Sequence, residues 1–210
     1  MRKEPNWLLW ARELLAIAQT GLEYCKDPYD RDRYLAVRAV GARMMAEPSD
    51  AEPAEVERLF AEHSGYATPK VDVRGAVFRD DGRILMVREA TDLRWSLPGG
   101  WAEVNQSPRE AVTREVVEET GFDISIRKLA AVYDRGLHPH LPLRPFHIFK
   151  MFFVCDLAGG DARTSTETIE IGFFAENELP ADISIGRVLP YQIARMFDHA
   201  RQPQLPTEFD

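Results

Sequence analysis

The chain contains few cysteines, no basic run and no long apolar run. Its two cysteines, Cys25 and Cys155, lie far apart without the spacing of a metal site, which argues against a disulfide framework and a cysteine metal cluster. This usage fits buried thiols in a reducing compartment, so we expect a cytoplasmic protein. Arg12 and Glu13 interrupt the apolar stretch WLLWARELLAIA, so we expect neither a signal peptide nor a membrane partner.

Positive charge is also scarce. Lys and Arg number 26 against 34 Asp and Glu, which gives a formal net charge of -8. Because no basic run is present, a nucleic-acid partner is not expected. Hydrophobic residues make up 45% and charged residues 29% of the 210 positions. These percentages are ordinary for a globular protein. A length of 210 residues suits one large domain, or a standard domain plus a small one.

The first third of the chain has the periodicity of helices. The pattern predicts helices over 6–25, with Asn6 as a possible cap, over 29–46 and over 53–63. The apolar positions noted on the first helix are Trp7, Trp10, Leu14, Ile17 and Ala18. We therefore predict a small helical domain over 1–66. Its surplus of aromatic side chains indicates docking onto the rest of the chain or onto a second subunit. We expect a homodimer in which this domain contributes to the contact.

Strand patterns begin at Val71. The pair Asp81-Gly82 is a hairpin signal between the first two strands. Strands are expected at 71–79, 84–89, 124–135, 146–157 and 169–175. A closing helix is predicted over 188–199, and residues 203–210 are predicted to form a loose tail. The second domain would cover 67–202 with an α/β or α+β fold. Within the loop 136–147, His138 and His140 lack zinc spacing and are interpreted as surface histidines.

An acidic helix is predicted between Ser107 and Gly121. Ser107-Pro108-Arg109-Glu110 is a capping box, and Gly121 supplies a left-handed cap. Three carboxylates then project from one face, those of Glu115, Glu118 and Glu119. Like charges at this spacing cost roughly 0.2–0.5 kcal/mol per pair, so a hard divalent cation would stabilise the helix. A solvated acidic face is the alternative reading of the same pattern.

The loop and helix together resemble one family. The pattern G-x5-E-x7-R-E-U-x-E-E-x-G-U, in which U is aliphatic or aromatic, is the Nudix box. In this chain it reads Gly100, Gln106, Arg114, Glu115, Val116, Glu118, Glu119, Gly121 and Phe122. The one departure is Gln106, where the family usually has Glu. The resemblance implies an α/β/α sandwich around a mixed sheet and cleavage of a pyrophosphate linkage with Mg²⁺, for which Mn²⁺ can substitute.

The resemblance also assigns roles to residues of this chain. Glu115 and Glu119 would be the principal metal ligands, and Glu118 an additional ligand or an orienter of water. Arg114 would hold these carboxylates in place, and the turn at Gly99-Gly100 would bring backbone close to a bound substrate. A loop acid before an aromatic pair often serves the family as an extra ligand or general base. Glu167 and Glu170 are both candidates, although either can also stand on the solvent face of a strand.

Further similarity points to a subgroup. The phrases VYDR, FHIFKMFF and EIGFFAENELP, with the helical N-terminal region, look like the subgroup that hydrolyses nucleoside diphosphates linked to a group X. CDP-choline is the first substrate this resemblance suggests, and ADP-ribose is the second. Gln106 motivates a rival, a metal-binding sensor without catalysis. An RNA-end-processing enzyme is a further rival, disfavoured by the negative net charge.

Overall fold

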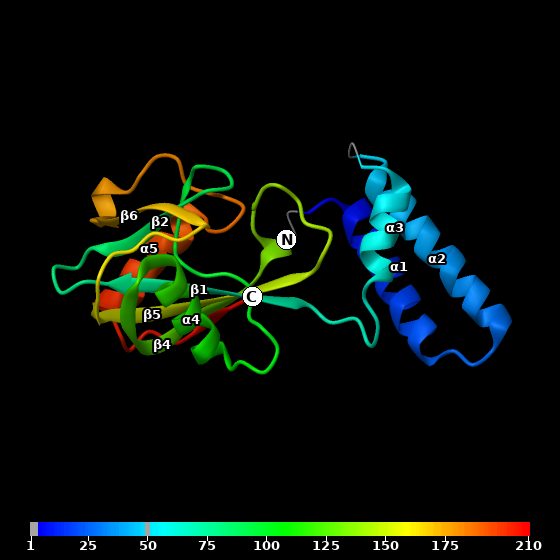
Figure 1. Cartoon of the computed structure of the whole chain (residues 1–210), viewed down its shortest axis with the longest axis horizontal. Coiled ribbons are helices and arrows are strands. Elements are labelled where there is room, and N and C mark those ends of the chain that lie inside the picture. The colour runs from blue at the N-terminus through cyan, green and yellow to red at the C-terminus, as the bar shows by residue number, and fades with distance from the viewer. Residues whose placement is uncertain (1–3, 49–50) are drawn as a thin grey trace. The chain divides into compact units, whose positions relative to one another are not determined.

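The computed structural model describes residues 4–48 and 51–210 and divides the chain into two compact units (Figure 1). The first comprises Met1–Pro69 with Leu143–His147, and the second comprises Lys70–Pro142 with Ile148–Asp210. The sequence predicts a boundary after residue 66 and does not separate 143–147 from the second domain. Residues 1–3 and 49–50 of the predicted helical domain lie outside the described residues.

Three helices form the part of the first unit that the structure describes. They are α1 (Asn6–Tyr24), α2 (Pro28–Ala46) and α3 (Pro53–Ala61). The carboxylate of Asp27 accepts the backbone N–H of Tyr29 at 2.7 Å, and Pro28 occupies the first turn, so α2 begins at a capped end. Pro5 stands at the cap position of α1 and Asn6 is already helical, so the predicted Asn6 cap is wrong.

The buried face of α1 shares only Ala18 with the apolar positions named from the sequence. Its buried residues are Leu8, Ala11, Leu15 and Ala18, and three of them pack in one cluster with α2 and α3. Trp10 and Ile17, in contrast, are 56% and 48% exposed. Because α1 is apolar around most of its circumference, periodicity alone fits two faces. The alanine-containing face is buried, since small side chains allow close helix packing.

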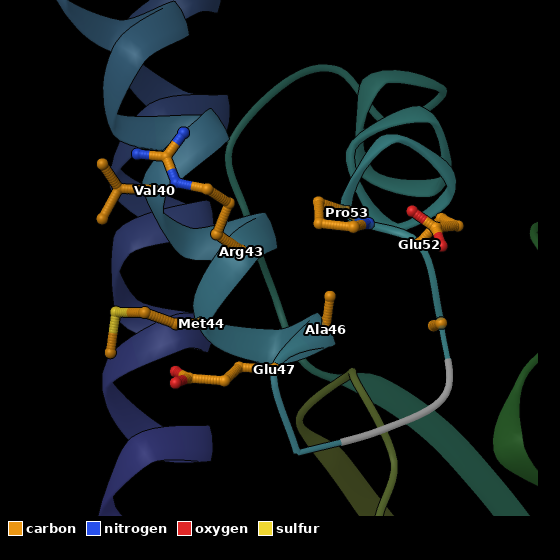
Figure 2. Close-up of a pocket in the computed structure, with 8 residues that line it drawn as sticks. Val40, Arg43, Met44, Ala46, Glu47, Glu52 and Pro53 are labelled. Atoms are coloured by element: carbon orange, nitrogen blue, oxygen red, sulfur yellow. The ribbon is translucent and has the colours of Figure 1, made fainter.

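A pocket of about 500 Å³ lies between the end of α2 and the start of α3 (Figure 2). Val40, Met44 and Pro53 are among the residues that line it. Arg43, Glu47 and Glu52 lie beside them. None of the acidic residues predicted for catalysis belongs to this pocket.

A mixed seven-stranded sheet forms the second unit, in the order β3-β2-β1-β5-β4-β7, with β6 paired to β2. Its strands are β1 (Lys70–Phe78), β2 (Ile84–Glu89), β3 (Trp95–Ser96), β4 (Phe122–Asp134), β5 (Ile148–Gly160), β6 (Thr168–Phe174) and β7 (Glu208–Phe209). β1 and β2 are antiparallel across the Asp81-Gly82 turn, where Gly82 has φ +80°. The predicted hairpin is therefore confirmed.

The sheet lies between two helices, α4 (Pro108–Thr120) and α5 (Pro190–Arg201). Alternate residues of a strand point to opposite faces. On β1, Val73 and Val77 pack with α4, whereas Ala76 and Phe78 pack with α5. The second unit is therefore the predicted α/β/α sandwich around a mixed sheet.

Two predictions about the second unit are wrong. Residues 203–210 are not loose, because β7 pairs in parallel with β4 and Glu208 accepts a 2.6 Å hydrogen bond from the Tyr133 hydroxyl. His140 is not a surface residue, since it is 2% exposed and its Nδ1 lies 2.7 Å from the Ile185 carbonyl oxygen. The His138 side chain is only 13% exposed and its Nε2 lies 3.0 Å from the Asp210 carboxylate. Both errors come from partners distant in sequence.

Within residues 4–48 and 51–210, none of the helices is long and apolar enough to cross a membrane.

Candidate active site

Helix α4 is fixed at both ends by residues next to it in sequence. The Ser107 N–H donates to Glu110 Oε2 at 2.8 Å, and Ser107 Oγ accepts the Glu110 N–H at 3.3 Å, which confirms the capping box. Gly121 ends the helix with φ +74°, where a Cβ would lie 2.4 Å from the Asp161 carbonyl oxygen. With both ends defined, the side chains that α4 presents to the sheet are defined as well.

The turn Pro98-Gly99-Gly100 runs along β1 and faces α4. The Val73 N–H donates to the Gly100 carbonyl at 2.8 Å, and the Gly75 N–H donates to the Pro98 carbonyl at 2.9 Å. Gly99 has φ +140°, and a Cβ on it would meet the Val73 carbonyl oxygen at 2.1 Å. The close approach of this turn to β1 therefore requires glycine at position 99.

Two of the three predicted carboxylates meet this turn. The Gly99 N–H donates to Glu119 Oε2 at 2.9 Å, and a Cβ on Gly100 would lie 2.8 Å from Glu115 Oε2. Glu115 and Glu119 are 8% and 4% exposed. Burial raises the pKa of Glu119 to about 8, although the charge of Arg74 and the Gly99 N–H oppose the shift. Burial also raises the pKa of Glu115.

Arg114 connects the acidic face to the turn. Its guanidinium lies 2.7 Å from Glu115 and 2.7 Å from Glu118, whose side chain is 58% exposed. Its Nε donates to Gln106 Oε1 at 3.3 Å, and its Nη2 lies 3.9 Å from the Glu103 carboxylate. Gln106, the departure from the Nudix box, therefore contacts Arg114 through its side-chain oxygen.

Sequence reasoning missed a buried polar network on β1 and β5. Arg74 donates to both carboxylate oxygens of Asp72, at 3.0 and 2.8 Å, and to the Leu97 carbonyl at 3.1 Å. Lys150 Nζ lies 2.5 Å from Asp72. Burial acts to raise the pKa of Asp72, but the charges of Arg74 and Lys150 lower it to about 2. The signal was available, because charged residues within an apolar strand demand a partner.

Glu89 at the end of β2 is a second residue that the sequence analysis missed. It is 3% exposed, Arg187 Nε lies 2.8 Å from its Oε1, and burial raises its pKa. Its charge acts on Glu119, and the charge of Glu167 acts on Glu89 in turn. The signal in the sequence was an acidic residue at the end of an apolar strand.

The structure places Glu167 in the loop before β6 and Glu170 within β6, so the two candidate acids have different surroundings. Thr168, next to Glu167, donates from its hydroxyl to the Glu119 carbonyl oxygen at 2.7 Å. The backbone at Glu167 is also tied to β2, because its carbonyl accepts the Ala90 N–H at 2.7 Å. Glu170 instead forms an exposed ion pair with Arg88 at 3.3 Å. The neighbourhood of the buried carboxylates therefore includes Glu167.

The donor set fits a hard divalent cation. Within the two described segments, no group of three His, Cys, Asp or Glu side chains is arranged to hold a metal ion. Arg114 and the Gly99 N–H contact the acids of α4 instead. The donors are nevertheless all carboxylate oxygens, the type that Mg²⁺ prefers. Burial disfavours charge on Glu115 and Glu119, and a cation held by these two residues would favour their charged forms.

Comparisons with known proteins agree with this geometry. Residues 5–60 match the model described as "UDP-X-like, N-terminal oligomerisation domain", and residues 68–192 match the NUDIX domain. The chain is 42% identical over its full length to the whole of the "Putative ADP-ribose pyrophosphatase YjhB" of Bacillus subtilis (strain 168).

Two solved structures are also similar. The crystal structure of a UDP-X diphosphatase is 33% identical, with a TM-score of 0.62 and full coverage of both chains. That of an ADP-ribose pyrophosphatase from Streptococcus suis is 34% identical, with a TM-score of 0.59, and covers 68% of this chain and 100% of its own. The matched domain spans more than half of the chain and contains the α4 carboxylates. The chain belongs to the Nudix family and is a hydrolase of pyrophosphate bonds.

Proposed function

We propose that the protein hydrolyses the pyrophosphate linkage of a nucleoside diphosphate joined to a second group X. The oxygen of water bonds to one phosphorus while the bridging P–O bond breaks, giving a nucleoside monophosphate and phospho-X. The observation that supports this most is the pair of buried carboxylates, Glu115 and Glu119, which face the Gly99-Gly100 turn. A buried acidic site of this kind suits a divalent ion and a polyanionic substrate.

Nudix hydrolases generally use divalent metal ions, and we propose Mg²⁺ here, with Mn²⁺ as a substitute. A bound ion would neutralise the pyrophosphate charge and lower the pKa of water. In this proposal Glu115 and Glu119 hold the ion, and the more exposed Glu118 binds a further ion or orients water. Arg114 keeps Glu115 and Glu118 aligned through its two 2.7 Å ion pairs. We propose that the turn at Gly99 and Gly100 brings its backbone close to the substrate phosphates.

Of the two candidate acids, Glu167 has more support as the extra ligand or general base. It acts electrostatically on Glu89, whose charge reaches Glu119. Glu170 already pairs with Arg88, so we propose Glu167 for this role. If Glu167 acts in this way, Glu167→Gln will lower kcat more than Glu170→Gln.

For the nucleotide and the group X, the subgroup resemblance favours CDP-choline. The names of the relatives favour ADP-ribose and UDP-linked compounds, which have as much support as CDP-choline. The decisive experiment incubates the protein and Mg²⁺ with CDP-choline, ADP-ribose, a UDP-sugar and an RNA with a 5′-triphosphate, and identifies the products. We expect a nucleoside monophosphate and phospho-X from at least one conjugate, and no reaction when EDTA is present. Cleavage of the RNA alone would favour RNA-end processing over this proposal.

We further propose a cytoplasmic homodimer to which residues 1–66 contribute. Both cysteines are free thiols and Cys155 is buried, which fits a reducing compartment. The match to an oligomerisation domain and the exposed aromatic residues of α1 support the dimer. Light scattering at micromolar concentration tests it, and a monomeric mass would reject it.

A further inference from the structure

Helix α1 carries a second apolar row on its exposed side. Trp10, Ile17 and Tyr24 are 56%, 48% and 64% exposed and follow one another at intervals of seven residues. Because seven residues make nearly two helical turns, the three side chains lie in one row, spaced about 10 Å apart along the axis. Such a row on a surface helix is typical of a contact between helices.

Little charge accompanies this row. Arg12 pairs with Glu4 at 2.6 Å, and the Glu23 carboxylate accepts the Gly65 N–H at 3.0 Å. Glu13, three residues after Trp10 and four before Ile17, lies on the same face and is exposed, whereas Leu14, Thr20 and Gly21 at the other positions of this face are uncharged. A face with little charge around exposed aromatic residues resembles the centre of an interface more than ordinary surface.

A pocket opens at one end of the row. It measures about 550 Å³ and is lined by α1, by α2 and by Tyr66 and Ala67. The α1 and α2 residues include Ile17, Gly21, Tyr24, Asp30 and Tyr34. A Cβ on Gly21 would lie 2.3 Å from the Tyr34 ring, so glycine allows that ring to lie against α1. Trp10, at the other end of the row, does not line the pocket and offers a large exposed ring.

We propose that a second copy of this chain docks on this row with the two α1 helices antiparallel and Ile17 on the two-fold axis. In a two-fold contact, if residue i meets residue j, then j meets i. Trp10 and Tyr24 are equidistant from Ile17 in sequence, so each Trp10 meets the Tyr24 end of the other helix and enters its pocket. An aromatic side chain seated in a pocket is the usual anchor of an interface.

The spacing favours a second copy over an unrelated partner. The spacing of the row is symmetric about Ile17, while its two ends differ: the Trp10 end offers an exposed ring and the Tyr24 end a pocket. In the antiparallel arrangement the ring of each copy therefore meets the pocket of the other. The inference rests on the homodimer proposed above and specifies which face of α1 forms its contact. The match of residues 5–60 to an oligomerisation domain supports the same partner.

Cross-linking tests the register. In a Cys25→Ser background, Ile17→Cys places the same thiol of both copies at the axis, where a short bismaleimide should convert most of the protein to a covalent dimer. Asp32→Cys, an exposed position on α2, is the matched control and should stay monomeric under denaturing conditions. Equal cross-linking of both variants, or none at position 17, would overturn the proposed register.

A charged residue at the two-fold axis provides a second test of the contact. Ile17→Asp brings two carboxylates together and should raise the dimer dissociation constant by at least about a hundredfold, whereas Asp32→Asn should leave it unchanged. Circular dichroism checks that both variants fold. A wild-type dimer that Ile17→Asp leaves intact overturns this contact but not the homodimer, while a monomeric wild type overturns both.

Discussion

The backbone N–H of Gly99 donates to Glu119 Oε2 at 2.9 Å, which joins the glycine turn to the C-terminal part of α4. The turn itself is held to β1 by two backbone hydrogen bonds. The Glu119 carboxylate is therefore fixed and largely removed from water, and burial raises its pKa to about 8. A fixed, desolvated acid interacts strongly with any cation that reaches it.

Removing either buried carboxylate should abolish most of the activity without unfolding the protein. We predict that Glu115→Gln and Glu119→Gln each lower kcat at least about a hundredfold. Stability should hold or rise slightly, because each change removes a buried acid and relieves repulsion on α4. Steady-state kinetics and thermal melting measure the two effects. Glu178→Gln, which removes an exposed acid paired with Arg83, is the control, and near-wild-type turnover in either α4 variant rejects the metal assignment.

Gln106 should support catalysis in place of the Glu that the family usually has. Its Oε1 already accepts from Arg114 Nε at 3.3 Å, and Glu103 places a carboxylate 3.9 Å from the same guanidinium. We predict that wild-type protein is active with Mg²⁺ and that Gln106→Glu changes kcat less than about tenfold, or roughly 1.4 kcal/mol. An inactive wild type that binds metal and gains strong activity with Gln106→Glu would favour the sensor hypothesis.

Arg74 should act through the position of the glycine turn. It joins the Asp72 carboxylate to the Leu97 carbonyl, and lysine would keep the charge but cannot span both partners in this planar geometry. We predict that Arg74→Lys lowers kcat by about tenfold or more with little change in KM. If Arg74→Lys retains full turnover, charge alone explains the role of this residue.

The sequence predicted those parts of the fold and of the site that depend on residues close together in the chain. The capping box at Ser107 and the Gly121 cap are local, so α4 and its acidic face were predicted correctly. Asp72 and Arg74 both lie on β1, but Lys150 lies opposite Asp72 on β5, so the third member of the network needed the sheet register. Helix α1 is apolar on two faces, and only its neighbours decide which one is buried.

His140 should make folding sensitive to acid. Burial, with the charge of Lys150, lowers its pKa to about 3 from 6.5. Between these values the unfolded chain binds a proton that the folded chain does not, so stability falls as the pH drops below about 6.5, by about 1.4 kcal/mol per pH unit. His140→Gln should remove this contribution. Urea unfolding measures the free energy of unfolding of the wild type and of His140→Gln at pH 7 and at pH 5. The difference between the two proteins should change by about 2 kcal/mol between these pH values. A difference that does not depend on pH would contradict the assignment.

Metal binding itself tests the central claim most directly. Electron paramagnetic resonance of free Mn²⁺, titrated with protein in the absence of substrate, reports binding without requiring turnover. We predict that wild-type protein binds Mn²⁺ and that Glu115→Gln combined with Glu119→Gln weakens this affinity at least about tenfold, while Glu178→Gln leaves it unchanged. Equal Mn²⁺ affinity in the wild type and the double variant would contradict a metal site built on these two carboxylates.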